Sequence, residues 1–261
     1  MEGHNVCLSQ GRCKTKDMGI GSMKIIEEYI NSPEIAFGRS TVYELLSHCY
    51  GEPEKEFMDF IKDGGFFEHM INALRHHPKL RNEILDALHA LTDEMIRMDM
   101  DELLRGYKLI VSPERNLLYE GNYHHPFNTY EEMADIAGFY RAFGFDFAGE
   151  RPDHICLELE FMRILCLKEA MALSASDKEK VELTVNAEKE FLLSHLGRWS
   201  EALLKITEGI PFYNTLSRFL NEWIGLEGNL YNLSIDKIFY INRLNEESNE
   251  LCLKEERDER F

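Results

Sequence analysis

One compact run of polar residues, Arg151-Pro152-Asp153-His154, lies just before two acidic residues, Glu158 and Glu160. Carboxylates grouped in this way would attract a cationic ligand. The run also has a purely structural explanation, because Asp153 is well suited to be the N-cap of the helix that follows, with His154 in its first turn. If Asp153 is only a cap, asparagine should replace it with little loss of stability, and composition alone favours this interpretation.

The ten histidines invite a metal hypothesis, which their spacing does not support. The HExxH motif is absent, and so are the Glu-x-x-His pairs of di-iron bundles. The nearest pairs are Asp86-x-x-His89 and Glu44-x-x-x-His48. The adjacent pairs His76–His77 and His124–His125 would diverge by about 100° on a helix. We therefore predict no metal site and no cofactor.

Motifs typical of enzymes are also missing from the sequence. It contains no GxxxxGK[ST] phosphate loop, no GxGxxG and no GxSxG nucleophile elbow. We predict that the protein is not an enzyme. Two alternatives stay open: a helical-bundle enzyme that uses a metal or a nucleotide, and a helical adaptor unrelated to export.

The apolar residues recur at helical spacing along most of the chain. Ser32-Pro33 is a typical helix start, the stretch 79–110 is free of proline, and a helix is expected over 129–143. A long helix should follow residue 152, and the next should begin at a capping box formed by Ser176 and Glu179. With no βαβ alternation and no internal repeat, the pattern predicts an all-α, single-domain multi-helix bundle.

Two segments between these helices are expected to be ordered loops. The first, residues 112–126 (SPERNLLYEGNYHHP), is rich in proline, asparagine and glycine, and the second is residues 149–152. At the ends of the chain we expect a flexible extension over 1–23 and a partly ordered acidic tail over 228–261. The helical domain would occupy residues 24–227.

Charge and composition limit the classes of partner. The chain has 261 residues, 44% of them hydrophobic, and a formal net charge of −18, which repels phosphate backbones and argues against nucleic acid. The six cysteines form no CxxC pair, which favours reduced thiols. With no apolar stretch long enough to span a bilayer and no secretory signal, we expect a cytoplasmic protein without stable membrane insertion.

Three segments in order resemble one known family. Residues 149–162 (GERPDHICLELEFM) resemble the PDH-x-x-x-ELEFM signature of the TorD/DmsD/NarJ redox-enzyme maturation chaperones. Residues 103–107 and 118–123 (LYEGNY) are similar to its upstream helix and loop, and residues 191–199 (FLLSHLGRW) to its F-x-x-x-H-L-x-x-W helix break. The resemblance covers about residues 36–225. The chain has Tyr-Glu-Gly where many relatives have a Glu-Ser pair.

This resemblance implies an all-helical chaperone of anaerobic respiration. Such a chaperone binds the apoprotein of a molybdopterin-dependent catalytic subunit of the dimethyl sulfoxide reductase type, often at its twin-arginine signal peptide. It holds this client for cofactor insertion before export, and a homodimer is left open. The residues expected to line the client site come from two loops and one helix: Tyr119, Glu120, Tyr123, Arg151, Pro152, Asp153, His154, Glu158 and Glu160.

Overall fold

The computed structural model describes residues 32–124, 129–147 and 149–238, so the predicted extension over 1–23 and most of the tail lie outside the described residues. Within these ranges the chain forms helices and no strands, and the prediction of an all-α single domain is confirmed. The helices are α2 (Pro33–Tyr50), α3 (Lys55–Lys62), α4 (Gly65–Leu74), α5 (Asn82–Arg97), α6 (Met100–Val111), α7 (Thr129–Ala142), α8 (Ile155–Ser174), α9 (Lys178–Ser194), α10 (Leu196–Ile206) and α11 (Pro211–Tyr231), with a 3₁₀ turn η1 (Glu120–Asn122).

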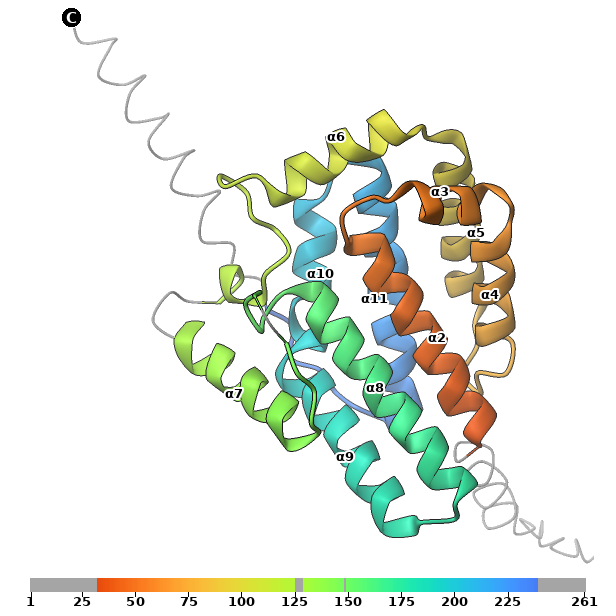
Figure 1. The fold of residues 1–261 in the computed structure, drawn as a ribbon, viewed down its shortest axis with the longest axis vertical. Coiled ribbons are helices and arrows are strands. Elements are labelled where there is room, and N and C mark those ends of the chain that lie inside the picture. Colours follow the sequence, from red (N-terminus) through yellow and green to blue (C-terminus); the bar gives the residue numbers. More distant parts are fainter. Residues whose placement is uncertain (1–31, 125–128, 148, 239–261) are drawn as a thin grey trace, which may run out of the picture.

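The long helices pack side by side around one apolar core (Figure 1). Helix α2 packs most extensively against α8, α8 also contacts α9, and α11 packs against α5 and α10. Helix α6 crosses one end of the bundle, and α7 lies on its outside. In the described part of the chain, no helix is both long and apolar enough to cross a membrane.

Two helix boundaries differ from the sequence prediction. The stretch 79–110 is divided after Arg97, because Asp99 and Glu102 form a capping box in which each side chain accepts from the other's backbone N–H, at 2.8 and 3.2 Å. The predicted cap at Ser176 is wrong by one residue. Asp177 accepts from the Lys180 N–H instead, while Ser176 has a left-handed backbone with φ of 55°.

A buried arginine, Arg39 of α2, links four helices. Its Nη1 lies 2.7 Å from Glu169 of α8, its Nη2 contacts Glu188 of α9, and its Nη2 and Nε lie 2.8 and 2.9 Å from the Glu227 carboxylate of α11. All four side chains are at most 2% exposed. Tyr43 also donates to Glu227, at 3.0 Å. The guanidinium therefore pairs with carboxylates that α8, α9 and α11 bring into the core.

We predict that Arg39→Leu destabilises the protein by about 3–5 kcal/mol, because it leaves three buried carboxylates without their cation. Urea denaturation measures the loss. The matched control is Arg81→Leu, whose guanidinium is 41% exposed and 3.6 Å from Glu222. This partly exposed pair should contribute less than about 1 kcal/mol. Equal effects of the two substitutions would contradict a central role for Arg39.

The cluster also predicts a pH dependence. Burial and the nearby charge of Glu188 raise the pKa of Glu169 from 4.5 to about 8, although Arg39 acts in the opposite direction. Between these two values, unfolding releases a proton, so this group makes the fold less stable as pH rises. We expect Glu169→Gln, which cannot ionise, to gain stability relative to the parent between pH 5 and 8. Urea curves at several pH values measure the difference, and a constant difference would refute the prediction.

Candidate functional site

The loop before η1 is joined directly to the start of α8. Tyr119 and His154 form an isolated antiparallel bridge, in which the Glu120 N–H donates to the Asp153 carbonyl at 2.9 Å. The Ile155 N–H donates to the Leu118 carbonyl at 2.8 Å. Residues more than thirty positions apart in the sequence are thereby brought together, as the predicted two-loop site requires.

Asp153 is not the cap of α8, contrary to the structural interpretation of the sequence. The N-cap is His154, whose Nδ1 accepts from the Cys156 N–H at 3.2 Å. Burial lowers the pKa of this imidazole, in keeping with a neutral ring that accepts through Nδ1. The Asp153 carboxylate is fully buried and accepts from the Gly121 N–H at 3.0 Å and from Arg151 Nε and Nη2 at 3.0 and 2.6 Å.

Gly121 allows this close approach of loop and carboxylate. A Cβ atom at this position would lie 2.8 Å from Asp153 Oδ2 and 2.6 Å from the Thr129 methyl group. Both distances are well below van der Waals contact. The Tyr-Glu-Gly sequence of this loop therefore has a steric reason, since only glycine leaves space for the Asp153 carboxylate.

Arg151 closes the outer side of the junction. Its guanidinium lies 4.7 Å from the centroid of the Tyr119 ring, a cation–π contact. The exposed Glu150 accepts from the Tyr119 hydroxyl and from the Arg151 N–H, both at 2.9 Å. Burial and then the Glu150 carboxylate raise the pKa of Tyr119 to about 12, so its hydroxyl stays protonated at neutral pH.

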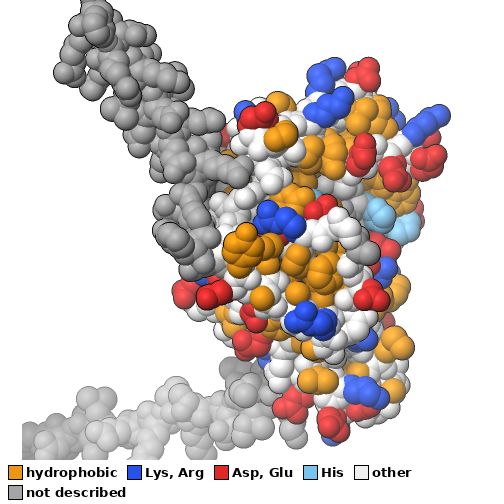
Figure 2. All heavy atoms as spheres, turned by 60° about the vertical axis from the view of Figure 1, so that its left-hand side comes forward, with side chains coloured by type: hydrophobic (Ala, Val, Ile, Leu, Met, Phe, Trp, Pro, Cys, Tyr) orange, Lys and Arg blue, Asp and Glu red, His pale blue; other side chains and the backbone are white. Residues whose placement is uncertain are grey.

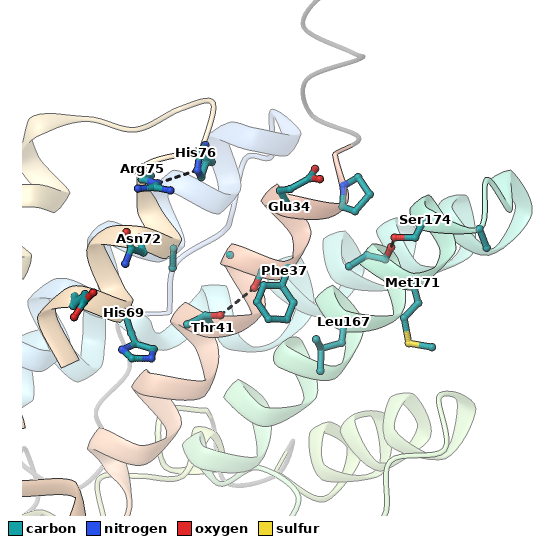
Figure 3. Close-up of a pocket in the computed structure, with 16 residues that line it drawn as sticks. Glu34, Phe37, Thr41, His69, Asn72, Arg75, His76, Leu167, Met171 and Ser174 are labelled. Carbon is teal, nitrogen blue, oxygen red and sulfur yellow. Dashed lines mark hydrogen bonds between the residues drawn. The ribbon is translucent and has the colours of Figure 1, made fainter. Parts of the chain in front are cut away.

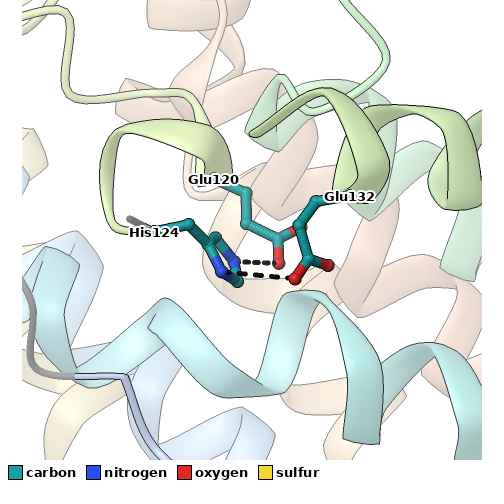
Figure 4. Close-up of side chains that lie close together, drawn as sticks. All are labelled: Glu120, His124 and Glu132. Atoms are coloured by element: carbon teal, nitrogen blue, oxygen red, sulfur yellow. Dashed lines mark hydrogen bonds and ion pairs between the residues drawn. The ribbon is translucent and has the colours of Figure 1, made fainter. Parts of the chain in front are cut away.

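A second polar cluster is built around Glu120 and lies beneath the loop (Figure 4). Its buried carboxylate contacts His124 Nε2 at 2.8 Å and His195 Nδ1 at 3.3 Å. Glu132 lies 3.4 Å from His124 Nδ1, and Asp135 lies 3.2 Å from His195 Nε2. Burial would lower the pKa of His195, but the Glu120 and Asp135 carboxylates raise it above its usual value. Burial would likewise raise the pKa of Glu120, but His124 and His195 lower it. The cluster ties the loop to α7 and to the break between α9 and α10.

Ligand atoms of Glu120, His124 and Glu132 lie within 4.8 Å of one another, a grouping that could hold a metal ion. The arrangement itself fits ion pairs better. The two carboxylates contact different nitrogens of one imidazole ring, and the lone pairs of those nitrogens point apart. A single ion could use only one of them, so His124 would have to turn. The only sequence signal for this cluster is the spacing Glu120-x-x-x-His124, which was not among the predicted ligand pairs.

Glu158 and Tyr123 lie in the interior and not on a groove. The Glu158 carboxylate is fully buried and accepts from Trp199 Nε1 at 3.1 Å. Burial and then the charge of Glu120 raise its pKa well above the usual range, so Glu158 does not supply the negative surface charge expected of it. Tyr123 packs on Trp199 and donates to the Leu117 carbonyl at 2.8 Å.

The accessible members of the predicted site form a smaller surface, which we call the motif rim. It consists of the half-buried Tyr119, Arg151, Pro152, His154 and Glu160, together with the exposed Glu150, which was not among the predicted site residues. Glu160 pairs with Arg163 at 3.1 Å, the i+3 contact that the sequence also allowed. The motif thus divides into buried residues that hold the loop and a few outer residues that solvent or a partner can reach.

The structure also shows a groove of about 1090 Å³ between α2, α4 and α8, which the sequence motifs do not indicate (Figure 3). Phe37 and Met171, 59% and 72% exposed, lie along it. On the face of the molecule shown in Figure 2, hydrophobic patches lie between dispersed acidic and basic side chains.

We predict that Asp153→Asn destabilises the protein by about 1–3 kcal/mol, because an amide nitrogen would replace an oxygen that accepts from Arg151 or Gly121. This reverses the expectation for a simple cap. Urea denaturation measures the loss, and hydrogen exchange should be faster at the Gly121 amide. In the control, Glu150→Gln, the exposed side chain keeps a carbonyl acceptor, so the change should stay within about 0.5 kcal/mol. Unchanged stability of Asp153→Asn would contradict the buried-anchor role.

Comparisons with known proteins agree with the resemblance seen in the motifs. A 50-residue segment is 46% identical to the chlorate reductase assembly chaperone protein of Ideonella dechloratans, covering 19% of this chain and 25% of that relative. The chain thus matches about a quarter of the relative's length. The family model described as nitrate reductase delta subunit matches residues 77–205, which include both loops of the site. The matched segment is thus similar to a NarJ/TorD-type family of assembly chaperones, and the similarity covers just under half of the chain.

Proposed function

We propose that the protein is a cytoplasmic chaperone for a molybdopterin-dependent catalytic subunit. It would bind the apoprotein, or the twin-arginine signal peptide, of a client of the dimethyl sulfoxide reductase type and hold it for cofactor insertion before export. The observation that carries the proposal is the family match over residues 77–205, the segment that contains the two joined loops. The similarity to a chlorate reductase assembly chaperone protein supports it.

The geometry indicates which carboxylates could bind an arginine side chain of a client. Asp153 already accepts three hydrogen bonds from within the chain, and the Tyr119 face already carries Arg151. On the motif rim, Glu150 accepts from Tyr119 and Arg151 through one oxygen only, Oε1, and Glu160 pairs with Arg163. A client guanidinium would therefore bind the other oxygen of Glu150 or compete with Arg163 for Glu160. A guanidinium binds a carboxylate with two parallel hydrogen bonds, which an ammonium cannot do.

Affinity capture tests the assembly role. We expect the tagged full-length chain to capture the catalytic subunit of a molybdopterin enzyme from its native host, in the form that lacks the cofactor. Mass spectrometry identifies the subunit, and molybdenum analysis shows whether it is loaded. A chain that reproducibly captures other proteins and no such subunit would favour the adaptor alternative, and a copurifying nucleotide would favour the enzyme.

Fluorescence anisotropy with labelled signal peptides tests the recognition site. Replacement of both peptide arginines by glutamine should weaken binding about tenfold, or about 1.4 kcal/mol, and lysine should restore it only in part. Added salt should weaken binding of the arginine peptide because it screens exposed carboxylates.

Variants of the chain provide the matched controls for this measurement. Glu150→Gln and Glu160→Gln should each reduce the preference for arginine, whereas Glu182→Gln, an exposed position on α9, should leave it unchanged. Equal affinity for the arginine, lysine and glutamine peptides would show that the motif rim does not read the arginines.

A further inference from the structure

The groove between α2, α4 and α8 has a floor of small residues, large apolar residues on its α2 and α8 sides, and polar residues such as His69, Asn72 and Arg75 on its α4 side. Helices α2 and α4 approach closely at its floor, where a Cβ atom on Gly38 would lie 2.7 Å from the Ala73 carbonyl oxygen. Phe37 on α2 and Leu167 and Met171 on α8 line the sides (Figure 3). Exposed apolar side chains beside a long concave surface are typical of a place where another segment packs.

We propose that residues 23–30 of this chain pack into the groove. The first position of the groove on α2 is Pro33, so the chain before α2 emerges at the end of the groove that Glu34 marks. Only Asn31 and Ser32 separate the segment from α2. Connections of two to five residues join antiparallel helices in helical hairpins. A segment that turned back after residue 30 would therefore run along the groove from Glu34 towards Thr41.

The sequence of the segment, MKIIEEYI, has the polarity that the groove requires. At 100° per residue its apolar side chains fall within an arc of about 160°. These are Met23, Ile25, Ile26, Tyr29 and Ile30. The opposite arc holds Lys24, Glu27 and Glu28. One face of a helix would thus be apolar and the other charged.

The length of the segment also matches the length of the groove. The groove borders α2 from Pro33 to Thr41, eight helical steps or about 12 Å. An eight-residue helix has the same length of about 12 Å. The segment would cover Phe37 and Met171 and leave its charged arc facing solvent. A segment of the same chain would thus cover the most exposed apolar side chains of the groove.

Oxidation of Met171 by hydrogen peroxide tests this in the full-length chain, because a thioether oxidises only where the reagent reaches it. We expect the double variant Ile26→Asp/Ile30→Asp to oxidise at Met171 about tenfold faster than the parent, equivalent to about 1.4 kcal/mol of docking free energy. Peptide mass spectrometry follows the sulfoxide. The half-buried Met133 of α7 is the internal control for oxidant strength.

A second double variant controls for changes in the segment as such. Lys24→Ala/Glu28→Ala alters two residues of the charged arc and should leave Met171 as slow as in the parent. Circular dichroism of all three chains checks that the helical domain is intact. Equal oxidation rates in parent and aspartate variant would overturn the proposal. Protection that disappears on dilution would also overturn it, since the segment would then come from a second copy.

Discussion

The fold depends on how one buried guanidinium offsets three buried carboxylates. Arg39 enters the core from α2 and meets Glu169, Glu188 and Glu227, which come from α8, α9 and α11. Each charge would be costly to bury alone, and together they are tolerable only while the helices keep this arrangement. One cation cannot neutralise three anions. Burial raises the pKa of both Glu169 and Glu188, which favours retention of a proton among them, and His77 Nε2 lies 3.4 Å from the third carboxylate, Glu227. The cluster therefore specifies which helices meet as well as holding them together.

The same principle operates at the two-loop site. Asp153 and Glu120 are buried carboxylates, and each has one partner nearby in the sequence, Arg151 and His124, and one on a distant segment, Gly121 and His195. The distant partners hold the loop in one position, because its movement would take them away from the buried carboxylates. The residues that carry the family resemblance thus act mainly as the support of the motif rim.

This division changes how the motif relates to client binding. The buried motif residues set the positions of Tyr119, Glu150 and Arg151 on the accessible motif rim. If the proposed client binds there, substitution of the buried residues would act on binding through the loop. The α2–α4–α8 groove is a separate apolar surface. A client with adjacent arginines and an apolar stretch would need surfaces of both kinds. If residues 23–30 dock as proposed, this segment of the same chain covers the groove, and a client could enter the groove only after the segment has left it.

The sequence by itself determined the helical fold, because the 3.6-residue period of apolar residues is a local property of each segment. It also predicted, through a resemblance carried by residues such as Asp153 and His195, that the two loops form one site, and the structure joins them at the Tyr119–His154 bridge. The tertiary structure decided which of these residues are accessible. Asp153 and Glu158 are as polar in sequence as Glu150 and Glu160, yet the first two are buried, because burial depends on helices distant in the sequence. The same holds for Arg39: no local pattern distinguishes it from a surface arginine until four helices pack around it.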